Sequence, residues 1–177
     1  MTVLVCLLWL CLLLPVVVVT GLSAGAIRIS VEQHIPDVTP SEVKDAWLSY
    51  QWRQGGGLPA VLVVFSQDGS SNNKKRRRLA PIWMEETLLD DGSSSSTNNQ
   101  VRYRVSDMGL FKSDLHSHDA NVSFIQDKEG GTNMIWNVAM GATSRKELWE
   151  KITEFNVKEA SKDLASFLST PLVYSRT

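Results

Sequence analysis

The sequence predicts an α+β domain in which a curved antiparallel sheet is covered by one long C-terminal helix. Strand-like runs follow one another along the chain instead of alternating with helices, and such grouping is typical of antiparallel sheets. One long amphipathic segment runs from Ser144 to Ser169, directly after two strand-like runs that Gly130 and Gly131 join. Because one face of such a sheet needs cover, we expect about six or seven strands wrapped around this helix, with a short helix after the first strand.

The start of the chain predicts a signal peptide. The first 26 residues contain no charged side chain, and their centre reads VLVCLLWLCLLLPVVVV. As a helix this run would be about 25 Å long, which is short for a membrane span. Small residues follow as signal peptidase prefers them, either Ala24 and Ala26 or Gly21 and Ser23. We predict that residues 1–26 are cleaved and that the protein is secreted or lumenal. Because no Lys or Arg precedes the run, an uncleaved signal anchor and a buried core helix stay as alternatives.

The composition bounds what remains after this segment. Both cysteines, Cys6 and Cys11, lie in the segment, so the mature chain would fold in an oxidising compartment without a disulfide. About 150 residues remain, enough for one domain that buries roughly 70% of its unfolded-chain surface. We place this domain at residues 27–170 and a C-terminal tail at residues 171–177. The formal net charge of −1 gives no general attraction to nucleic acid. We expect contact with a membrane only through an uncleaved leader. We also expect a monomer.

Two short elements open the predicted domain. The run AIRISVEQHI from Ala26 alternates apolar and polar residues, as a strand with one buried face does. The TPSE that begins at Thr39 is a complete capping box with proline at the first helical position. Apolar residues then follow at helical spacing: Val43, Ala46, Trp47 and Tyr50.

The middle of the chain reads as strands separated by polar loops. LPAVLVVFSQDG and LAPIWMEETLLDDG are predicted strands, followed by the loops SSNNKKRRR and SSSSTNN. The basic run Lys74–Arg78 is predicted to lie in a solvated loop, and the alternatives are a patch for phosphate or anionic lipid and a processing site for basic-specific proteases. VRYRVSD then alternates again. A second capping box, SRKE at Ser144, opens the long helix, which would extend about 37 Å to Ser169.

Four stretches carry a resemblance to a known superfamily. They are SEVKDAWLSY in the first helix, VRYRVSDMGLF, VSFIQDKEGGTNMIWNV in the last hairpin, and ELWEKIT with DLASFL in the closing helix. With the order of elements, they make Ile27–Leu168 resemble the helix-grip (SRPBCC) superfamily of START-like lipid carriers, polyketide cyclases and birch-pollen-allergen-like proteins. The resemblance implies a helix-grip fold with an apolar cavity between sheet and helix. It implies binding or transport of a small hydrophobic ligand, such as a lipid, polyketide or terpenoid, without a cofactor. The export signal and the two polar loops depart from the simplest members.

Aromatic and methionine side chains are the candidates for lining this cavity, since they supply a large and adaptable apolar wall. They are Trp83, Tyr103, Met134, Trp136 and Phe155. Plain core packing is the alternative interpretation of each. Alternation divides the set further, because Met134 and Trp136 share one face of their strand while Ile135 and Asn137 share the other.

The sequence contains no complete catalytic constellation, and the catalytic residues stay unknown. The candidates for an acid or a base are His116, His118 and Glu85. Glu85 and Glu86 are neighbours on a predicted strand, so alternation turns one of the two carboxylates inward. The two histidines have the spacing of one strand face and acidic neighbours. Ordinary hydrogen-bonded or solvent-facing histidines are the leading interpretation, and a zinc site of two histidines and a carboxylate is the alternative. Asn121 opens the sequon NVS and is a candidate for N-glycosylation.

Three functions are compatible with these patterns. The first is a carrier with a closed apolar cavity, and the second is a cyclase or dehydratase that uses a His, Glu or Tyr in that cavity as acid or base. The enzyme would need two or more ionisable groups near one empty point. The third is a membrane-anchored module whose basic loop contacts anionic surfaces. The sequence alone identifies neither the ligand nor the final compartment.

Overall fold

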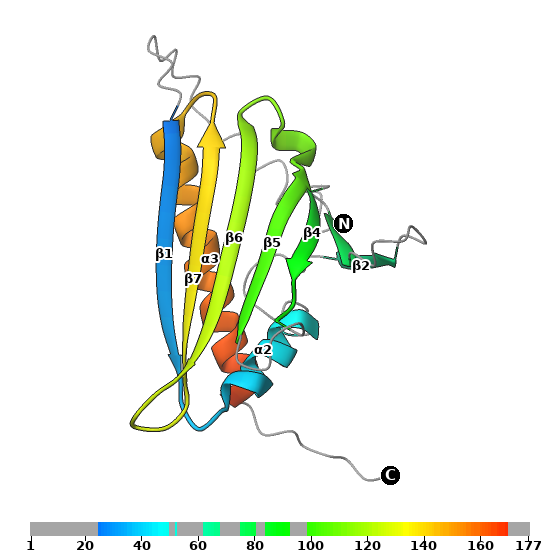
Figure 1. Ribbon diagram of the computed structural model, residues 1–177. Helices are drawn as coiled ribbons and strands as arrows, with labels where there is room; N and C mark the ends of the chain where they lie inside the picture. The colour runs from blue at the N-terminus through cyan, green and yellow to red at the C-terminus, as the bar shows by residue number, and fades with distance from the viewer. Residues whose placement is uncertain are drawn as a thin grey trace, which may run out of the picture.

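The computed structural model describes residues 25–49, 52, 62–67, 75–80, 84–92 and 99–169. Within them, seven strands form one antiparallel sheet in the order β1-β7-β6-β5-β4-β3-β2. The elements in chain order are β1 (Gly25–Ile35), α2 (Pro40–Ser49), β2 (Leu62–Gln67), β3 (Lys75–Ala80), β4 (Met84–Asp90), β5 (Gln100–Asp107), the 3-10 turn η2 (Gly109–Phe111), β6 (Leu115–Gln126), β7 (Thr132–Ala142) and α3 (Lys146–Ser169). The predicted fold class is confirmed: a curved antiparallel sheet with a short helix after the first strand and a long C-terminal helix (Figure 1).

Several sequence-based predictions fall on other residues. The leader up to residue 24, the loop SSSSTNN through residue 98, Trp83 and the tail 171–177 lie outside the described residues. Gly25 and Ala26, which the sequence assigns to the leader, open β1. In the part of the chain that is described, neither helix combines the length and the apolar character that a membrane crossing requires.

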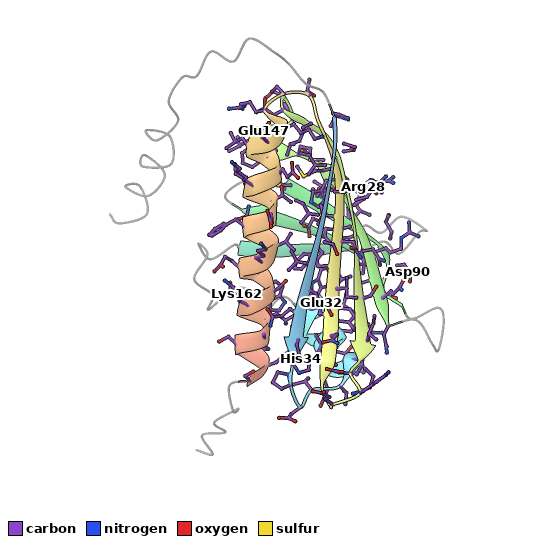
Figure 2. All side chains as sticks on the ribbon, turned by 90° about the vertical axis from the view of Figure 1, so that its left-hand side faces the viewer. Arg28, Glu32, His34, Asp90, Glu147 and Lys162 are labelled. Atoms are coloured by element: carbon purple, nitrogen blue, oxygen red, sulfur yellow. The ribbon has the colours of Figure 1, made fainter. Side chains whose placement is uncertain are left out.

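The first and last strands of the sheet are neighbours. β1 pairs with β7 over 11 residues of each strand, from Gly25 opposite Ala142 to Ile35 opposite Thr132. Because α3 follows β7 directly, the helix runs back beside the sheet and packs chiefly against β1. Figure 2 shows α3 as a separate layer, with Arg28 of β1 on the side of the sheet away from it. We call the face toward α3 the inner face and the opposite one the outer face.

Alternating residues build the core on the inner face. In β1 the apolar residues of the alternating pattern are buried and the polar ones are largely exposed, and in β5 the pattern is equally strict. From α3 the residues Trp149, Val157 and Leu164 are buried, and from α2 the buried residues include Val43 and Trp47. The periodicities in the sequence therefore identify the buried faces of β1, β5 and α2 correctly. The apolar stripe expected for α3 is wrong in part, because Leu148, Ile152, Phe155 and Phe167 are exposed while Ala160 and Leu164 are buried.

The capping box of α2 forms as predicted. Both the backbone N–H and the hydroxyl of Thr39 donate to the Glu42 carboxylate, at 2.9 and 2.7 Å, and the Glu42 N–H points back to the Thr39 hydroxyl at 3.4 Å. These hydrogen bonds lower the pKa of Glu42, because they favour its charged form. The helix therefore starts at Pro40, where the sequence places it.

The start of α3 differs from the prediction. The helix begins at Lys146. The Ser144 hydroxyl, which the sequence pattern predicts to cap the helix, donates to the Asp114 carboxylate at 2.8 Å. Asp114 also forms an ion pair with Arg145, and its carbonyl accepts the Thr143 N–H at 2.7 Å. Arg145 has a left-handed backbone with φ of 51°. The predicted capping box at Ser144 is wrong, because the helix begins one residue later than the box requires and Arg145, next to its start, is left-handed.

The basic run is also placed differently. β3 contains Lys75–Arg78, and its backbone pairs with β2 on one side and with β4 on the other. Arg76 forms an ion pair with Glu85 at 3.6 Å. The loop prediction is wrong for these residues, because pairing with two neighbouring strands overrides the weak strand preference of lysine.

The turn between β6 and β7 is fitted to the end of β1. The Gly131 carbonyl accepts hydrogen bonds from the Asp127 N–H at 3.1 Å and from the Gln126 side chain at 2.7 Å. The Thr132 hydroxyl donates to the Val38 carbonyl at 2.6 Å. A Cβ on Gly131 would lie 2.4 Å from the carbonyl oxygen of Ile35, so only glycine allows this close approach.

Gly131→Ala is expected to destabilise the fold more than Gly130→Ala. Both positions have positive φ, +85° and +100°, and an L-residue in a left-handed conformation costs about 1–2 kcal/mol. Only at position 131 does the new methyl group also meet backbone atoms, whereas nothing lies within 4 Å of it at position 130. Urea unfolding of both variants should show the larger loss for Gly131→Ala. Equal losses would contradict the close contact with Ile35.

Candidate functional site

Three aromatic rings from different elements meet on the inner face of the sheet. Trp47 of α2 lies 5.5 Å from the ring of Tyr103 on β5 and 5.7 Å from that of Trp136 on β7. The Trp136 indole N–H donates to the Tyr103 hydroxyl at 3.1 Å. The exposed fractions of the three residues are 0%, 3% and 5%. This aromatic cluster joins the short helix to two strands that are not adjacent in the sheet.

The predicted cavity-lining residues separate into three groups. Tyr103, Met134 and Trp136 are buried in the core. Trp83 lies outside the described residues. Phe155 does not join the others, since it is 57% exposed. Buried Val157 is two residues further along α3, about 200° around the helix, so the two side chains lie on opposite sides of it.

His118 extends the aromatic cluster along the inner face. It lies opposite Met140 of β7, and its ring is 6.0 Å from that of Tyr103. The residue is half-buried, and its Nδ1 atom is buried without a hydrogen-bond partner. Burial lowers the pKa of His118, because it disfavours the charged ring. Part of this lowering is offset by the charge of Glu86, by the histidine's own backbone and by the charge of Asp119. His118 is therefore a mainly neutral imidazole on the wall of an apolar interior.

Glu86, not Glu85, is the carboxylate of the pair that is buried. Glu86 is 6% exposed and lies opposite Val105. Glu85 accepts the Ser106 hydroxyl at 3.2 Å beside its ion pair with Arg76. The two glutamates are neighbours on β4, so their side chains point to opposite faces of the sheet. A register shift in the pairing of β4 with β5 lies between them. Since Leu88 and Leu89 are both apolar, the strand lacked the alternating signal that would have selected Glu86.

The two histidines of DLHSHD do not converge. The ring of His116 lies over Gly141, where a Cβ would come within 2.2 Å of its Nε2, and its Nδ1 is 3.5 Å from the Thr143 hydroxyl. A β-bulge between Leu115 and Ser117 changes the phase of the strand, so His116 is exposed while His118 enters the core side. Among the described residues no group of three His, Cys, Asp or Glu side chains is arranged for a metal ion.

A hollow of about 410 Å³ lies on the outer face of the sheet. Polar side chains of four strands surround it: Arg28, Ser30, Arg102, Asp119, Asn121 and Asn137. The sequence did not single out this site, because its residues come from strands far apart in the chain. Asn121, the predicted glycosylation site, is half-buried here, and its Oδ1 atom is buried without a hydrogen-bond partner.

Comparisons with known proteins place the fold. No family model and no curated protein matches the sequence. Among solved structures, that of Ara h 8.0201 matches with a TM-score of 0.61 and 12% identity over 82% of this chain and 100% of the other. The protein TTHA0849 from Thermus thermophilus matches with a TM-score of 0.54 and 17% identity, with the same coverage of both chains.

A third similar structure is larger than this chain. The di-domain ARO/CYC protein BexL, from the BE-7585A biosynthetic pathway, matches with a TM-score of 0.62 and 11% identity over 82% of this chain. The match covers 50% of BexL, so this chain spans about half of its length. At these identities the likeness concerns the fold, and the protein has the helix-grip fold that its sequence pattern resembles.

Proposed function

We propose that this protein binds a small hydrophobic molecule, such as a lipid, a polyketide or a terpenoid, between the inner face of the sheet and α3. The observation that carries the proposal is His118, whose Nδ1 is buried and has no hydrogen-bond partner in an interior otherwise walled by Tyr103, Trp136 and Met140. An unsatisfied buried polar group costs about 1–3 kcal/mol. A ligand with an apolar body and one polar group would offset this cost while its body contacts the rings.

The arrangement of α3 supports the same site. The helix packs chiefly against β1, and its Thr153 hydroxyl reaches the Met140 sulfur at 3.2 Å. The inner-face groups on β4, β5 and β6, namely Glu86, Tyr103 and His118, therefore lie farther across the sheet from the strand that α3 covers. The enclosed hollow itself stays a prediction, since part of its expected wall, including Trp83, is outside the described residues.

Acid–base catalysis of the cyclase or dehydratase kind is the second candidate function. It is favoured by one observation: Glu86 and His118 both lie on the inner face, where the charge of Glu86 offsets part of the lowering of the His118 pKa by burial. A neutral histidine with a carboxylate nearby can take a proton from a bound substrate. The same ligand site would serve both functions, so binding is tested first.

Filling the interior should abolish binding of a neutral apolar probe. Ala120 is 6% exposed on the inner face, opposite Tyr103 and Val138, and Ala120→Phe would occupy the proposed ligand space. Titration with the fluorescent probe N-phenyl-1-naphthylamine should show saturable binding to the wild type. The affinity of this variant for the probe should be lower by a factor of about ten or more. The matched control is Ala139→Phe, because Ala139 is exposed on the outer face and that variant should bind the probe as the wild type does.

The stability of Ala120→Phe decides between a hollow and a solid interior. A hollow accepts the ring with little loss, whereas overpacking a filled core costs about 1–3 kcal/mol. Thermal unfolding of both variants measures this difference. Strong destabilisation together with no saturable probe binding to the wild type would rule out the ligand-binding proposal.

The stability of the wild type should depend on pH through His118. The pKa of this histidine is lowered on folding from an ordinary value of 6.5. Below that pH the unfolded chain therefore binds a proton at His118 more readily than the folded protein does. Its contribution is fully present above pH 6.5 and is lost as the pH falls from there toward the lower pKa of the folded state. Urea unfolding between about pH 7.5 and pH 5 should show a weaker decline for His118→Gln. Parallel declines of the two proteins would contradict a buried neutral imidazole.

We further propose that the chain enters the secretory route and is cleaved after Ser23. Cleavage after Ala26 would remove the first two residues of β1, which pair with Ala142 and Gly141, whereas cleavage after Ser23 leaves that strand whole. Mass spectrometry of the protein secreted by its own cells should find Ala24 at its N-terminus. A full-length, membrane-bound chain would favour the uncleaved anchor instead.

A further inference from the structure

The hollow on the outer face is produced by the register of four strands. Ala139 of β7 lies between Arg28 of β1 and Asp119 of β6. Since its methyl group is short, the longer side chains on either side rise above it and leave a depression of about 410 Å³. This volume is within the range of small-molecule sites.

The neighbouring row across the sheet is polar at every position. Ser30 pairs with Asn137, Asn137 with Asn121, and Asn121 with Arg102. All four of these side chains line the hollow. A hydroxyl, two amides and a guanidinium therefore stand side by side on four adjacent strands.

The charge of the hollow is positive. Neither Arg28 nor Arg102 forms an ion pair with the described part of the chain. The carboxylate of Asp119 is already paired with Arg104 at 2.7 Å, and Asp90, opposite Arg102 in the sheet, forms no ion pair with it. Two guanidinium groups are thus available to a negatively charged group in the hollow.

The hollow also contains an unused acceptor. The Oδ1 atom of Asn121 is buried and accepts no hydrogen bond. Turning the amide over would exchange this acceptor for a buried donor, so one polar end of Asn121 lacks a partner in either orientation. Rotation of the Asn121 side chain toward the hollow would let a bound hydroxyl group, which both donates and accepts, satisfy it.

We propose that this hollow binds a small soluble anion that carries hydroxyl groups, of which a sugar phosphate is the simplest example. The phosphate would contact Arg28 and Arg102, since guanidinium groups bind phosphate with paired hydrogen bonds. The hydroxyl groups would meet Asn121, Asn137 and Ser30. This site lies on the opposite face of the sheet from the proposed hydrophobic ligand and does not depend on it.

Calorimetric titration of the full-length chain with ribose 5-phosphate tests the proposal. The protein is made in a host without N-glycosylation, so that Asn121 is unmodified. Saturable binding is expected, and raising the salt concentration should weaken it. Arg28→Gln and Arg102→Gln should each weaken it about threefold to fivefold, in keeping with exposed charged contacts, and the double variant should weaken it about tenfold or more.

Two variants control for net charge and for the hollow itself. Lys158→Gln removes the same charge from α3, where Lys158 pairs with Glu154, and should bind like the wild type. Ala139→Phe should lose ribose 5-phosphate while it keeps the apolar probe, so the failure of one site is distinguished from that of the other. Circular dichroism establishes that each variant is folded.

Five outcomes would overturn the proposal. Absence of saturable binding to the wild type would do so, as would an equal loss in Lys158→Gln, since the effect would then come from net charge alone. Equal affinity for ribose would exclude the anion site, and equal affinity for inorganic phosphate would exclude the role of Asn121. Binding to vesicles that contain phosphatidic acid, without binding of ribose 5-phosphate, would assign the arginines to a lipid surface instead.

Discussion

The structure depends above all on the pairing of β1 with β7. The two strands are complementary over 11 residues each, although more than half of the chain separates them. This pairing brings the start of the domain beside its last strand. Since α3 follows that last strand, the helix packs chiefly against β1. The turn between β6 and β7 secures the same contact, since Gly131 lies against the Ile35 backbone. Loss of this ladder would separate the helix from the sheet that it covers.

Two short irregularities in this sheet decide its chemistry. At the register shift between Glu85 and Glu86, one carboxylate is buried and the other pairs with Arg76. The bulge between Leu115 and Ser117 turns His118 toward Tyr103 while the ring of His116 lies over Gly141. In a regular strand, residues two apart share a face, so the bulge separates two histidines that a regular strand would keep together. A bulge can re-aim a side chain in this way without changing the order of strands.

The two faces of the sheet offer opposite environments to a ligand. On the inner face, aromatic rings surround a neutral histidine, and burial strengthens any hydrogen bond made there because the local dielectric is low. On the outer face, arginine and amide groups remain in contact with water, where charge attracts a ligand but salt screens the attraction. A single layer of backbone separates the two, since alternate residues of the same strands supply both. Occupation of one face therefore need not obstruct the other.

The amino-acid sequence by itself determined the class of the fold and the buried faces of β1, β5 and α2. Local periodicity and capping chemistry carry that information, and the TPSE box is satisfied within four residues. Tertiary structure alone decided the rest. Ser144 turns to Asp114, the basic run becomes β3, Phe155 faces solvent, and five strands contribute to the outer hollow. Each of these outcomes depends on how the elements pack or pair, and no local pattern encodes that arrangement.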